Sequence, residues 1–465
     1  MVLRYNRHTR TLEDRDFQYP LKDVEDPVHF EDIFPEGQVP VVPFNHRHVP
    51  MVPAVEIWIT DTTFRDGQQA MPPFSVENMV EIYKLLHALG GRRGLIRQSE
   101  FFLYQERDRE SIRRCQDLGY EYPEITGWIR ATRKDFELAK SMGMREVGIL
   151  TSVSDYHVFH KWKGFTRGKA LEQYLSVVKD ALSEGMIPRC HFEDITRADF
   201  YGFVVPFAIE LNKLSQESGV PIKIRACDTM GFGVPYPGAS LPRSVPGIIY
   251  GLNHFAGIPS EQLEWHGHND FHKVVANSAT AWLYGCSAVN ATVLGIGERT
   301  GNAPIEGMVM EYLALRGPDP DIDTTVITQI ARYLRDEVGY HIPPAQPFVG
   351  SHFNTTLAGI HADGLQKDQR IYTIFDTEKV LGVKPGIRIT DNSGLAGVAY
   401  WINVTLELEG QEAITKADPA VAAIHAEVKA QYEAGRVAVM SDAELLEMLS
   451  KHRPELAEKA RSMIW

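Results

Sequence analysis

Long hydrophobic runs, paired cysteines and an excess of positive charge are all missing from this sequence. No segment of the 465 residues approaches the ~18 consecutive apolar residues of a membrane span, and residues 1–17 lack the apolar core of a signal peptide. The four cysteines lie far apart with no CxxC pair, which argues against a disulfide framework and against a zinc ribbon. Lys plus Arg number 48 against 61 Asp plus Glu, so the formal net charge of −13 disfavours nucleic-acid partners and anionic membrane surfaces. We therefore expect a cytoplasmic protein with no membrane and no nucleic-acid partner.

The N-terminal residues differ in pattern from the rest of the chain. Residues 1–53 are rich in Pro and His and follow neither a 3.6-residue nor a 2-residue hydrophobic period. Apolar segments such as VPVVPF can still pack against something. We expect an ordered but irregular arm.

From Val55 onward, short apolar and β-branched runs alternate with amphipathic helical stretches. Eight such runs occupy residues 55–63, 94–102, 124–131, 146–154, 187–196, 222–231, 263–270 and 288–297. Helical stretches between them end in glycines suited to a left-handed C-terminal position. Eight strand–helix units within about 260 residues predict an α/β fold of the (β/α)8 TIM-barrel type. A doubly wound sheet is the alternative, but it usually has fewer strands and a Gly-rich phosphate loop after the first one.

The pattern sets the expected domains. The TIM barrel is assigned to residues 54–318 and a linker with a subdomain to residues 319–400, which contain the Pro-rich join IPPAQPF. Residues 401–465 are expected to form a small, mainly helical C-terminal region.

Chemistry-bearing residues follow the ends of three predicted strands, where TIM barrels place their catalytic groups. The first run leads into DTTFRDGQQ, with Arg65 beside Asp66, and the seventh ends in HGHND, where His266 and His268 face the same side. Two imidazoles and a carboxylate suit Zn, Mn, Co or Mg. Each motif alone also fits a structural role. The GIGERTGN segment after the eighth run fits either a phosphate cradle or a tight turn.

Taken together, DTTFRDGQQ, HGHND followed by VVANSATA, and GIGERTGN closely resemble the signature segments of the metal-dependent Claisen-condensing synthases. That family includes 2-isopropylmalate, homocitrate and citramalate synthases and the Re-face-specific citrate synthases. The resemblance spans residues 55–400. It departs at Phe64, where many members have Leu, and at Gln68, where many have Glu.

The resemblance implies roles for individual residues. It makes Asp66, His266 and His268 ligands of a divalent metal, with Asn302 close by, and Arg65 a contact of the 2-oxo acid. Further residues that it implies are the substrate-pocket residues Glu193 and Thr229 and the catalytic residues His361 and Tyr372. In the family the last two come from the partner subunit, which implies a homodimer with shared active sites. A packing role for His361 and a helix-capping role for Glu193 are the alternatives.

The choice of 2-oxo acid depends on residues 187–193 and on the second run. Arg189 lies four residues before Glu193, where homocitrate synthases bind the far carboxylate of 2-oxoglutarate, and strand alternation places His191 on the same side. Arg189 could instead neutralise Glu193. Gln98 begins the bulky segment QSEFF, which would shorten the pocket and favour oxaloacetate.

The chain resembles the Re-face citrate synthases most. The implied reaction is condensation of acetyl-CoA with oxaloacetate to citrate and CoA, catalysed by an acyltransferase. Homocitrate synthase and 2-isopropylmalate synthase are alternatives within the family. A metal-dependent acyl-CoA lyase and an inactive metal-binding regulator are alternatives outside it.

Overall fold

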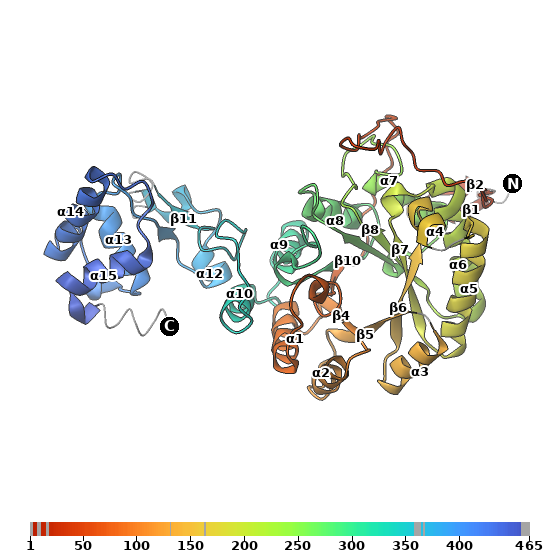
Figure 1. The fold of residues 1–465 in the computed structure, drawn as a ribbon, viewed down its shortest axis with the longest axis horizontal. Coiled ribbons are helices and arrows are strands. Elements are labelled where there is room, and N and C mark those ends of the chain that lie inside the picture. Colours follow the sequence, from red (N-terminus) through yellow and green to blue (C-terminus); the bar gives the residue numbers. More distant parts are fainter. Residues whose placement is uncertain are drawn as a thin grey trace. The chain divides into compact units, whose positions relative to one another are not determined.

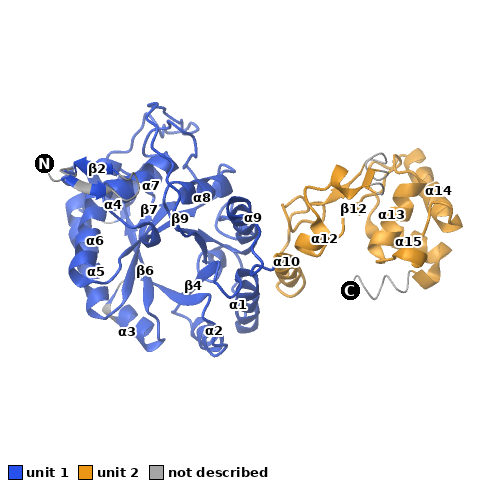
Figure 2. Ribbon diagram, turned by 180° about the vertical axis from the view of Figure 1, so that it is seen from behind, with its two compact units in different colours: residues 1–323 blue, residues 324–465 orange. Residues whose placement is uncertain are grey.

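The computed structural model divides into two compact units, residues 1–323 and 324–465 (Figure 2). The residues that it describes are 3–6, 11–14, 18–130, 132–161, 164–357, 364–365 and 368–456. The finer boundaries at residues 53, 318 and 400 stay predictions.

The first unit is built on a closed barrel of eight parallel strands in the order β10-β3-β4-β5-β6-β7-β8-β9 (Figure 1). The strands are β3 (Trp58–Asp61), β4 (Ile96–Phe102), β5 (Glu124–Ile129), β6 (Glu146–Ser152), β7 (Ile187–Glu193), β8 (Lys223–Asp228), β9 (Leu263–Gly267) and β10 (Ala288–Ala291). Each lies within one of the eight expected runs, so the predicted TIM barrel is confirmed.

Helices surround the barrel in Figures 1 and 2. They are α1 (Val76–Gly90), α2 (Glu106–Gln116), α3 (Arg133–Ser141), α4 (Asp155–Lys161), α5 (Arg167–Ser183), α6 (Val205–Ser218), α7 (Val245–His254), α8 (Val274–Leu283) and α9 (Ile305–Arg316). Short turns of 3₁₀-helix are η1 (Gly67–Ala70), η2 (Ile195–Arg197), η4 (Ser260–Gln262) and η5 (Val293–Gly295), and η3 (Phe200–Val204) is a turn of π-helix.

Local sequence explains where these helices begin and end. The hydroxyl groups of Ser75, Thr132 and Thr166 cap α1, α3 and α5 by accepting a backbone N–H bond. Gly91 follows the end of α1 with a φ of 67°, a conformation that residues with a Cβ rarely adopt. These three helices therefore begin at hydroxyl caps, and α1 ends at a glycine as the sequence predicts.

Side chains alternate along each barrel strand between the surrounding helices and the barrel interior. On β7, Phe192 stacks against Phe207 of α6, with ring centroids 4.8 Å apart. The alternate residues Arg189, His191 and Glu193 therefore point into the barrel. The interior is consequently rich in charged groups, and it includes Glu100, Glu146, Arg189, Arg225 and Glu264, each at most 4% exposed.

The N-terminal arm runs irregularly over the barrel after a short hairpin of β1 (Leu3–Asn6) and β2 (Thr11–Asp14). Buried arginines hold it: Arg167 donates to the carbonyl of Lys22, and Arg243 donates to the carbonyls of Pro40 and Val41. The hairpin was not expected. Leu3 and Tyr5 do alternate with polar residues, but four residues are too few to indicate a strand, and Thr11–Asp14 shows no such alternation.

The second unit contains a small helical region, as expected. Its elements are α10 (Val326–Asp336), β11 (Thr355–Thr356), η6 (Gln369–Ile371), α12 (Thr377–Leu381), β12 (Gly386–Ile387), α13 (Leu395–Thr405), η7 (Gly410–Glu412), α14 (Pro419–Glu433) and α15 (Asp442–His452). Apolar residues of α13, α14 and α15 form its core, with Trp401, Ile424 and Leu449 buried. Within the described part of the chain, no helix combines the length and apolar character required to cross a membrane.

Candidate metal centre and active site

Three predicted ligands converge at the carboxyl ends of the strands. Asp66 lies in the turn after β3, and its backbone N–H donates to the carbonyl of Thr62. His266 lies on β9 and His268 directly after it. Asp66 Oδ2 is 3.8 Å from His266 Nε2 and 3.8 Å from His268 Nε2, and the two imidazole nitrogens are 3.3 Å apart.

These distances are close to those expected around a shared cation. Two ligand atoms that each lie about 2.1 Å from an ion, at angles of about 90–110°, are separated by roughly 3.0–3.5 Å. The 3.3 Å between the imidazoles lies in that range, and the two distances of 3.8 Å slightly exceed it. Asp66 Oδ2 and Asn302 Oδ1 are buried and have no hydrogen-bond partner. Asn290 Oδ1 lies 2.8 Å from His266 Nδ1 and can accept a hydrogen bond from it, which favours the tautomer protonated at Nδ1. The Nε2 lone pair of His266 is then free for a metal.

The electrostatics suit metal binding as well. Burial would raise the pKa of Asp66, but the guanidinium of Arg65 and the contacts with the two histidines lower that pKa to about 2. Burial lowers the pKa of His266 to about 3 and also lowers the pKa of His268. The group therefore offers one carboxylate and two neutral imidazoles at neutral pH, the protonation state that a divalent cation requires.

The loop after β10 brings Asn302 to this centre. His268 and Asn302 form a β-bridge, and the backbone N–H of Asn302 donates to the carbonyl of Gly295, 2.9 Å away. A Cβ at Gly297 would lie 2.2 Å from Asn302 Nδ2. The glycines of GIGERTGN therefore form a tight turn that leaves room for Asn302.

Arg65 lies between the metal centre and the barrel interior. Its Nη1 is 3.2 Å from Asp66 Oδ1, and its Nε donates to Glu100 Oε2 over 2.9 Å. The same Glu100 oxygen accepts from Thr62 Oγ1 and from Arg225 Nη1, at 3.0 and 2.9 Å. Glu100 therefore fixes the orientation of Arg65, while the Arg65 side chain stays 11% exposed.

Glu193 ends β7 and contacts two residues of α4. His157 Nδ1 lies 2.9 Å and Lys161 Nζ 2.6 Å from Glu193 Oε2, which also accepts a hydrogen bond from Ser152. Burial opposes ionisation, but the bonds from His157 and Lys161 lower the pKa of Glu193 to about 2. Sequence reasoning missed His157 and Lys161, although their i, i+4 spacing just after the fourth run places them on one helix face.

Thr229 links neighbouring loops at the same end of the barrel. Its Oγ1 accepts from the backbone N–H of Asp194, and its carbonyl accepts from Arg299 Nη2. Arg299 also pairs with Asp270 at 2.9 Å. The predicted pocket residue Thr229 therefore lies where the loops after β7, β8, β9 and β10 meet.

Two predicted substrate contacts lie deeper than expected. The Gln98 amide donates to Glu124 and Glu146, the first residues of β5 and β6, at the end of the barrel opposite the metal centre. Arg189 lies four residues before Glu193, which corresponds to ~13 Å along a strand. Alternation predicts which face of a strand a side chain occupies, but it does not tell how deep in the barrel that side chain lies.

The guanidinium group of Arg189 is already engaged by carboxylates. It lies 3.1 Å from Glu146, 3.3 Å from Glu264 and 3.8 Å from Glu100. Arg225 is paired with Glu100 and Glu264, but its Nη2 is buried without a hydrogen-bond partner.

Arg225 is also closer to the mouth than Arg189. It lies opposite His191 in the strand register, two residues nearer the mouth. Burial lowers the pKa of His191 to about 4 and keeps that imidazole neutral.

Sequence reasoning missed Glu100, Arg225 and Glu264 as a group. They lie inside apolar runs, where a charged residue breaks the pattern of a strand buried on both faces. Arg225 and Glu264 lie two residues before Cys227 and His266. Residues two apart on a strand face the same side, so this spacing could have indicated that both side chains point into the barrel.

The two catalytic residues expected from beyond the barrel belong to the second unit. His361 lies outside the described residues. Tyr372 directly follows η6 and is 44% exposed.

Comparison with known proteins gives a consistent result. The family described as HMGL-like matches residues 56–334. A protein named citrate (Re)-synthase from Syntrophus aciditrophicus is 54% identical over 98% of this chain and 73% of that protein. Another of the same name from Clostridium kluyveri is 51% identical over 95% of this chain and 98% of that protein. A 2-phosphinomethylmalate synthase from Streptomyces hygroscopicus is 36% identical over 92% and 97%.

Proposed function

Since this chain belongs to the HMGL-like family, we propose that it is a citrate (Re)-synthase, an acyltransferase that condenses acetyl-CoA with oxaloacetate to give citrate and CoA. The observation that carries the proposal is the identity of more than half of the residues, over nearly the whole chain, to two proteins of that name. The convergence of Asp66, His266 and His268 supports it independently.

Asp66, His266 and His268, with Asn302 beside them, would hold a divalent cation such as Mn²⁺, Co²⁺, Zn²⁺ or Mg²⁺. When bound, such an ion supplies Lewis-acid polarisation of the ketone of the 2-oxo acid.

The protein's own groups account for the remaining requirements. Arg65 is held by Glu100 and faces the metal centre, where it donates hydrogen bonds to the keto oxygen and to the alkoxide that forms from it. Thr229 Oγ1 accepts from the backbone N–H of Asp194 and keeps its own O–H to donate to an oxygen of the 2-oxo acid. Glu193 is ionised and accepts hydrogen bonds only, so its part is to hold His157 and Lys161 at the mouth. An imidazole removes a proton from the acetyl methyl group, a role that the family resemblance gives to His361 with Tyr372 beside it. Hydrolysis of the citryl thioester then releases CoA.

The second carboxylate of oxaloacetate requires a cation below the mouth. Arg189 and Arg225 are the two buried candidates. We propose that Arg225 binds this carboxylate, because it is two residues closer to the mouth and its Nη2 has no hydrogen-bond partner. Arg189 Nε also lacks a hydrogen bond, but it lies 3.1 Å from Glu146. Arg189 supports Arg225 through Glu264, which both arginines contact.

This assignment predicts unequal effects of two matched variants. A charge-assisted hydrogen bond contributes about 1.5–3 kcal/mol, so Arg225→Gln should raise the KM for oxaloacetate by about one to two powers of ten. Arg189→Gln should raise it less, and neither should change the KM for acetyl-CoA. Steady-state kinetics on folded, metal-loaded protein measures both values. Equal losses for the two substrates would mean that these arginines are structural. A larger effect at Arg189 would mean that Arg189, and not Arg225, binds the second carboxylate of oxaloacetate.

The proposed reaction is tested by mixing the purified protein with acetyl-CoA and one 2-oxo acid at a time, and following free thiol. We expect thiol release with oxaloacetate to exceed release with 2-oxoglutarate, 2-oxoisovalerate or pyruvate. Labelled acetyl-CoA then shows which arm of citrate the acetyl group forms, and therefore which face is attacked. A preference for 2-oxoglutarate would identify a homocitrate synthase. Cleavage of citryl-CoA without condensation would identify a lyase.

We also propose a cytoplasmic homodimer in which His361 and Tyr372 complete the partner's active site. The family resemblance is the main support. Ile371 and Ile374, on either side of Tyr372, are 56% and 68% exposed, and apolar side chains next to a catalytic residue are suited to cover by another subunit.

A further inference from the structure

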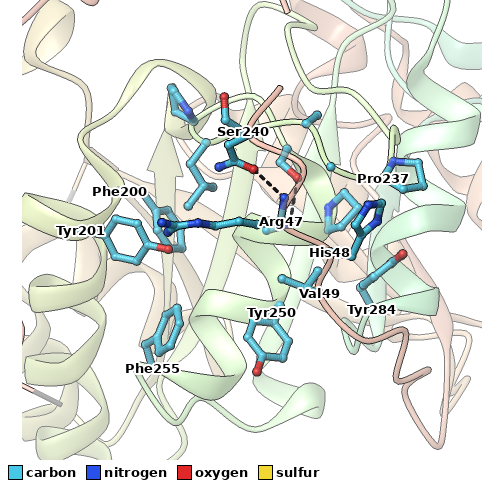
Figure 3. A pocket seen from close by; sticks show the side chains of 18 of the residues that line it. Arg47, His48, Val49, Phe200, Tyr201, Pro237, Ser240, Tyr250, Phe255 and Tyr284 are labelled. Carbon is cyan, nitrogen blue, oxygen red and sulfur yellow. Dashed lines mark hydrogen bonds between the residues drawn. The ribbon is translucent and has the colours of Figure 1, made fainter. Parts of the chain in front are cut away.

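A cavity of about 420 Å³ lies away from the metal centre (Figure 3). Its walls are the arm around residues 45–49, the segment 198–201 that follows β7, and the loop 237–247 that leads into α7, together with Tyr250, Phe255 and Tyr284. None of the residues assigned above to the metal or to the 2-oxo acid lines it. Its volume falls within the range of small-molecule sites.

One end of this cavity is aromatic. Tyr201, which is 41% exposed, lies with its ring centroid 5.9 Å from that of Phe255. Phe255 in turn meets Tyr250 edge to face at 5.9 Å. Tyr19 stacks on one side of Tyr201, with ring centroids 5.8 Å apart, so these rings form an aromatic cluster beside which a further flat ring can stack.

A cationic side chain crosses the cavity. Arg47 comes from the arm and extends toward Tyr201 (Figure 3). Among the described residues, none forms an ion pair with Arg47. The only acidic residue of the lining is Asp199, and its carboxylate already accepts from Arg167 and from the backbone N–H of Gly202. Arg47 and Asp199 are thus the two charged residues of the lining, and because Asp199 is engaged by Arg167, the guanidinium of Arg47 is the charge left for a ligand.

Backbone hydrogen bonds fix the walls of the cavity. Asn45 and His46 donate their N–H groups to the carbonyl of Gly238, and the N–H of Ser240 donates to the carbonyl of Pro43. Phe44 and Ala239 form a β-bridge between them. The arm and the loop are thus joined like two strands, and the site is formed before any ligand enters.

A guanidinium beside a group of aromatic rings selects a ligand that carries both an anion and a flat ring. Arginine binds phosphate with paired hydrogen bonds, and a nucleobase is the flat ring that most commonly accompanies phosphate. We propose that this cavity binds an adenine nucleotide, with a phosphate on Arg47 and the base among Tyr201, Phe255 and Tyr250.

The nucleotide could come from either of two sources. If the proposed function holds, acetyl-CoA brings an adenosine diphosphate group to this protein. The loop after β8 starts with Thr229 at the mouth of the barrel and continues to the cavity wall at residues 237–242, so it links the mouth to the cavity. The other source is a free nucleotide that acts as an effector.

The test is titration calorimetry of the full-length protein with ADP, with CoA and with adenosine, which lacks phosphate. We expect ADP to bind at least tenfold more tightly than adenosine, and Arg47→Ala to weaken ADP at least tenfold. Arg92→Ala, whose side chain is 95% exposed on the same unit, is the matched control and should leave ADP binding unchanged. Tyr201→Ala tests the ring wall and should weaken ADP and adenosine alike.

Kinetics separate the two sources. If Arg47→Ala raises the KM for acetyl-CoA and leaves that for oxaloacetate unchanged, the cavity holds the nucleotide end of CoA. If it removes ADP binding without altering either KM, the ligand is a free nucleotide. Failure of ADP to bind wild-type protein, or equal binding to wild type and to Arg47→Ala, would overturn the proposal. The ADP titration needs no turnover, so its result does not depend on the proposed condensation.

Discussion

The His268→Ala variant is expected to lose its tightly held divalent cation, and its condensation activity with it. His268 Nε2 lies 3.3 Å from His266 Nε2 and 3.8 Å from Asp66 Oδ2, so its removal leaves one imidazole and one carboxylate at the centre. Disturbing the residues that merely orient metal ligands costs 10–100-fold in affinity. Loss of a ligand itself should therefore weaken retention by about 100-fold or more.

Elemental analysis after dialysis, compared with wild type, measures this retention. His341→Ala is the matched control, because His341 is an exposed histidine in the second unit and should leave the metal content intact. The fold should survive in His268→Ala, because the substitution removes no partner from the hydrogen bond between Asn290 and His266. Wild-type metal content in the dialysed His268→Ala protein would refute the assignment of this centre.

Replacing Arg65 should lower the turnover rate far more than substrate binding. Its guanidinium is held between Asp66 and Glu100 and faces the centre where the ketone becomes an alkoxide. A hydrogen-bond donor aimed at developing negative charge typically contributes 10²–10³ in kcat. We expect Arg65→Ala to lose about that factor, with a much smaller change in the KM for acetyl-CoA.

Arg65→Lys separates charge from geometry. Lysine keeps the positive charge but cannot contact Glu100 and the substrate with a planar fork of donors, so it should restore only part of the rate. Metal content measured on the same samples shows whether the loss arises at Arg65 alone. A fall in metal content that matches the fall in rate would mean that Arg65 acts by holding Asp66 rather than by binding the substrate.

The barrel could be predicted because its signals are local. Apolar runs of strand length, hydroxyl N-caps such as Ser75 and glycines such as Gly91 each fix one element, and eight repeats of the unit leave few possible architectures. The convergence of Asp66, His266 and His268 could be predicted for a related reason. His266 and His268 are separated by one residue at a strand end, and barrel closure brings the loop after β3 to the same mouth.

Depth within the barrel could not be predicted. Strand alternation correctly places the Arg189 side chain inside the barrel. Which carboxylates it contacts depends on the stagger between neighbouring strands, and a single sequence does not indicate that stagger. Gln98 shows the same limit, because its partners are the first residues of the next two strands. The bulk of QSEFF suggested a shortened pocket, whereas the charge of Glu100 within it is what orients Arg65.

The charged interior of the barrel makes its residues mutually dependent in evolution and in engineering. Glu100 contacts Arg65, Arg189 and Arg225, and Glu264 contacts the last two as well. Deleting one partner of a buried ion pair leaves an uncompensated charge that costs about 3–5 kcal/mol. A change of substrate range at Arg225 would therefore require a simultaneous change at a glutamate, and such paired substitutions show strong epistasis. Single-residue libraries would sample this interior poorly, and designs that exchange a cation and an anion together are the ones expected to yield folded proteins with new preferences.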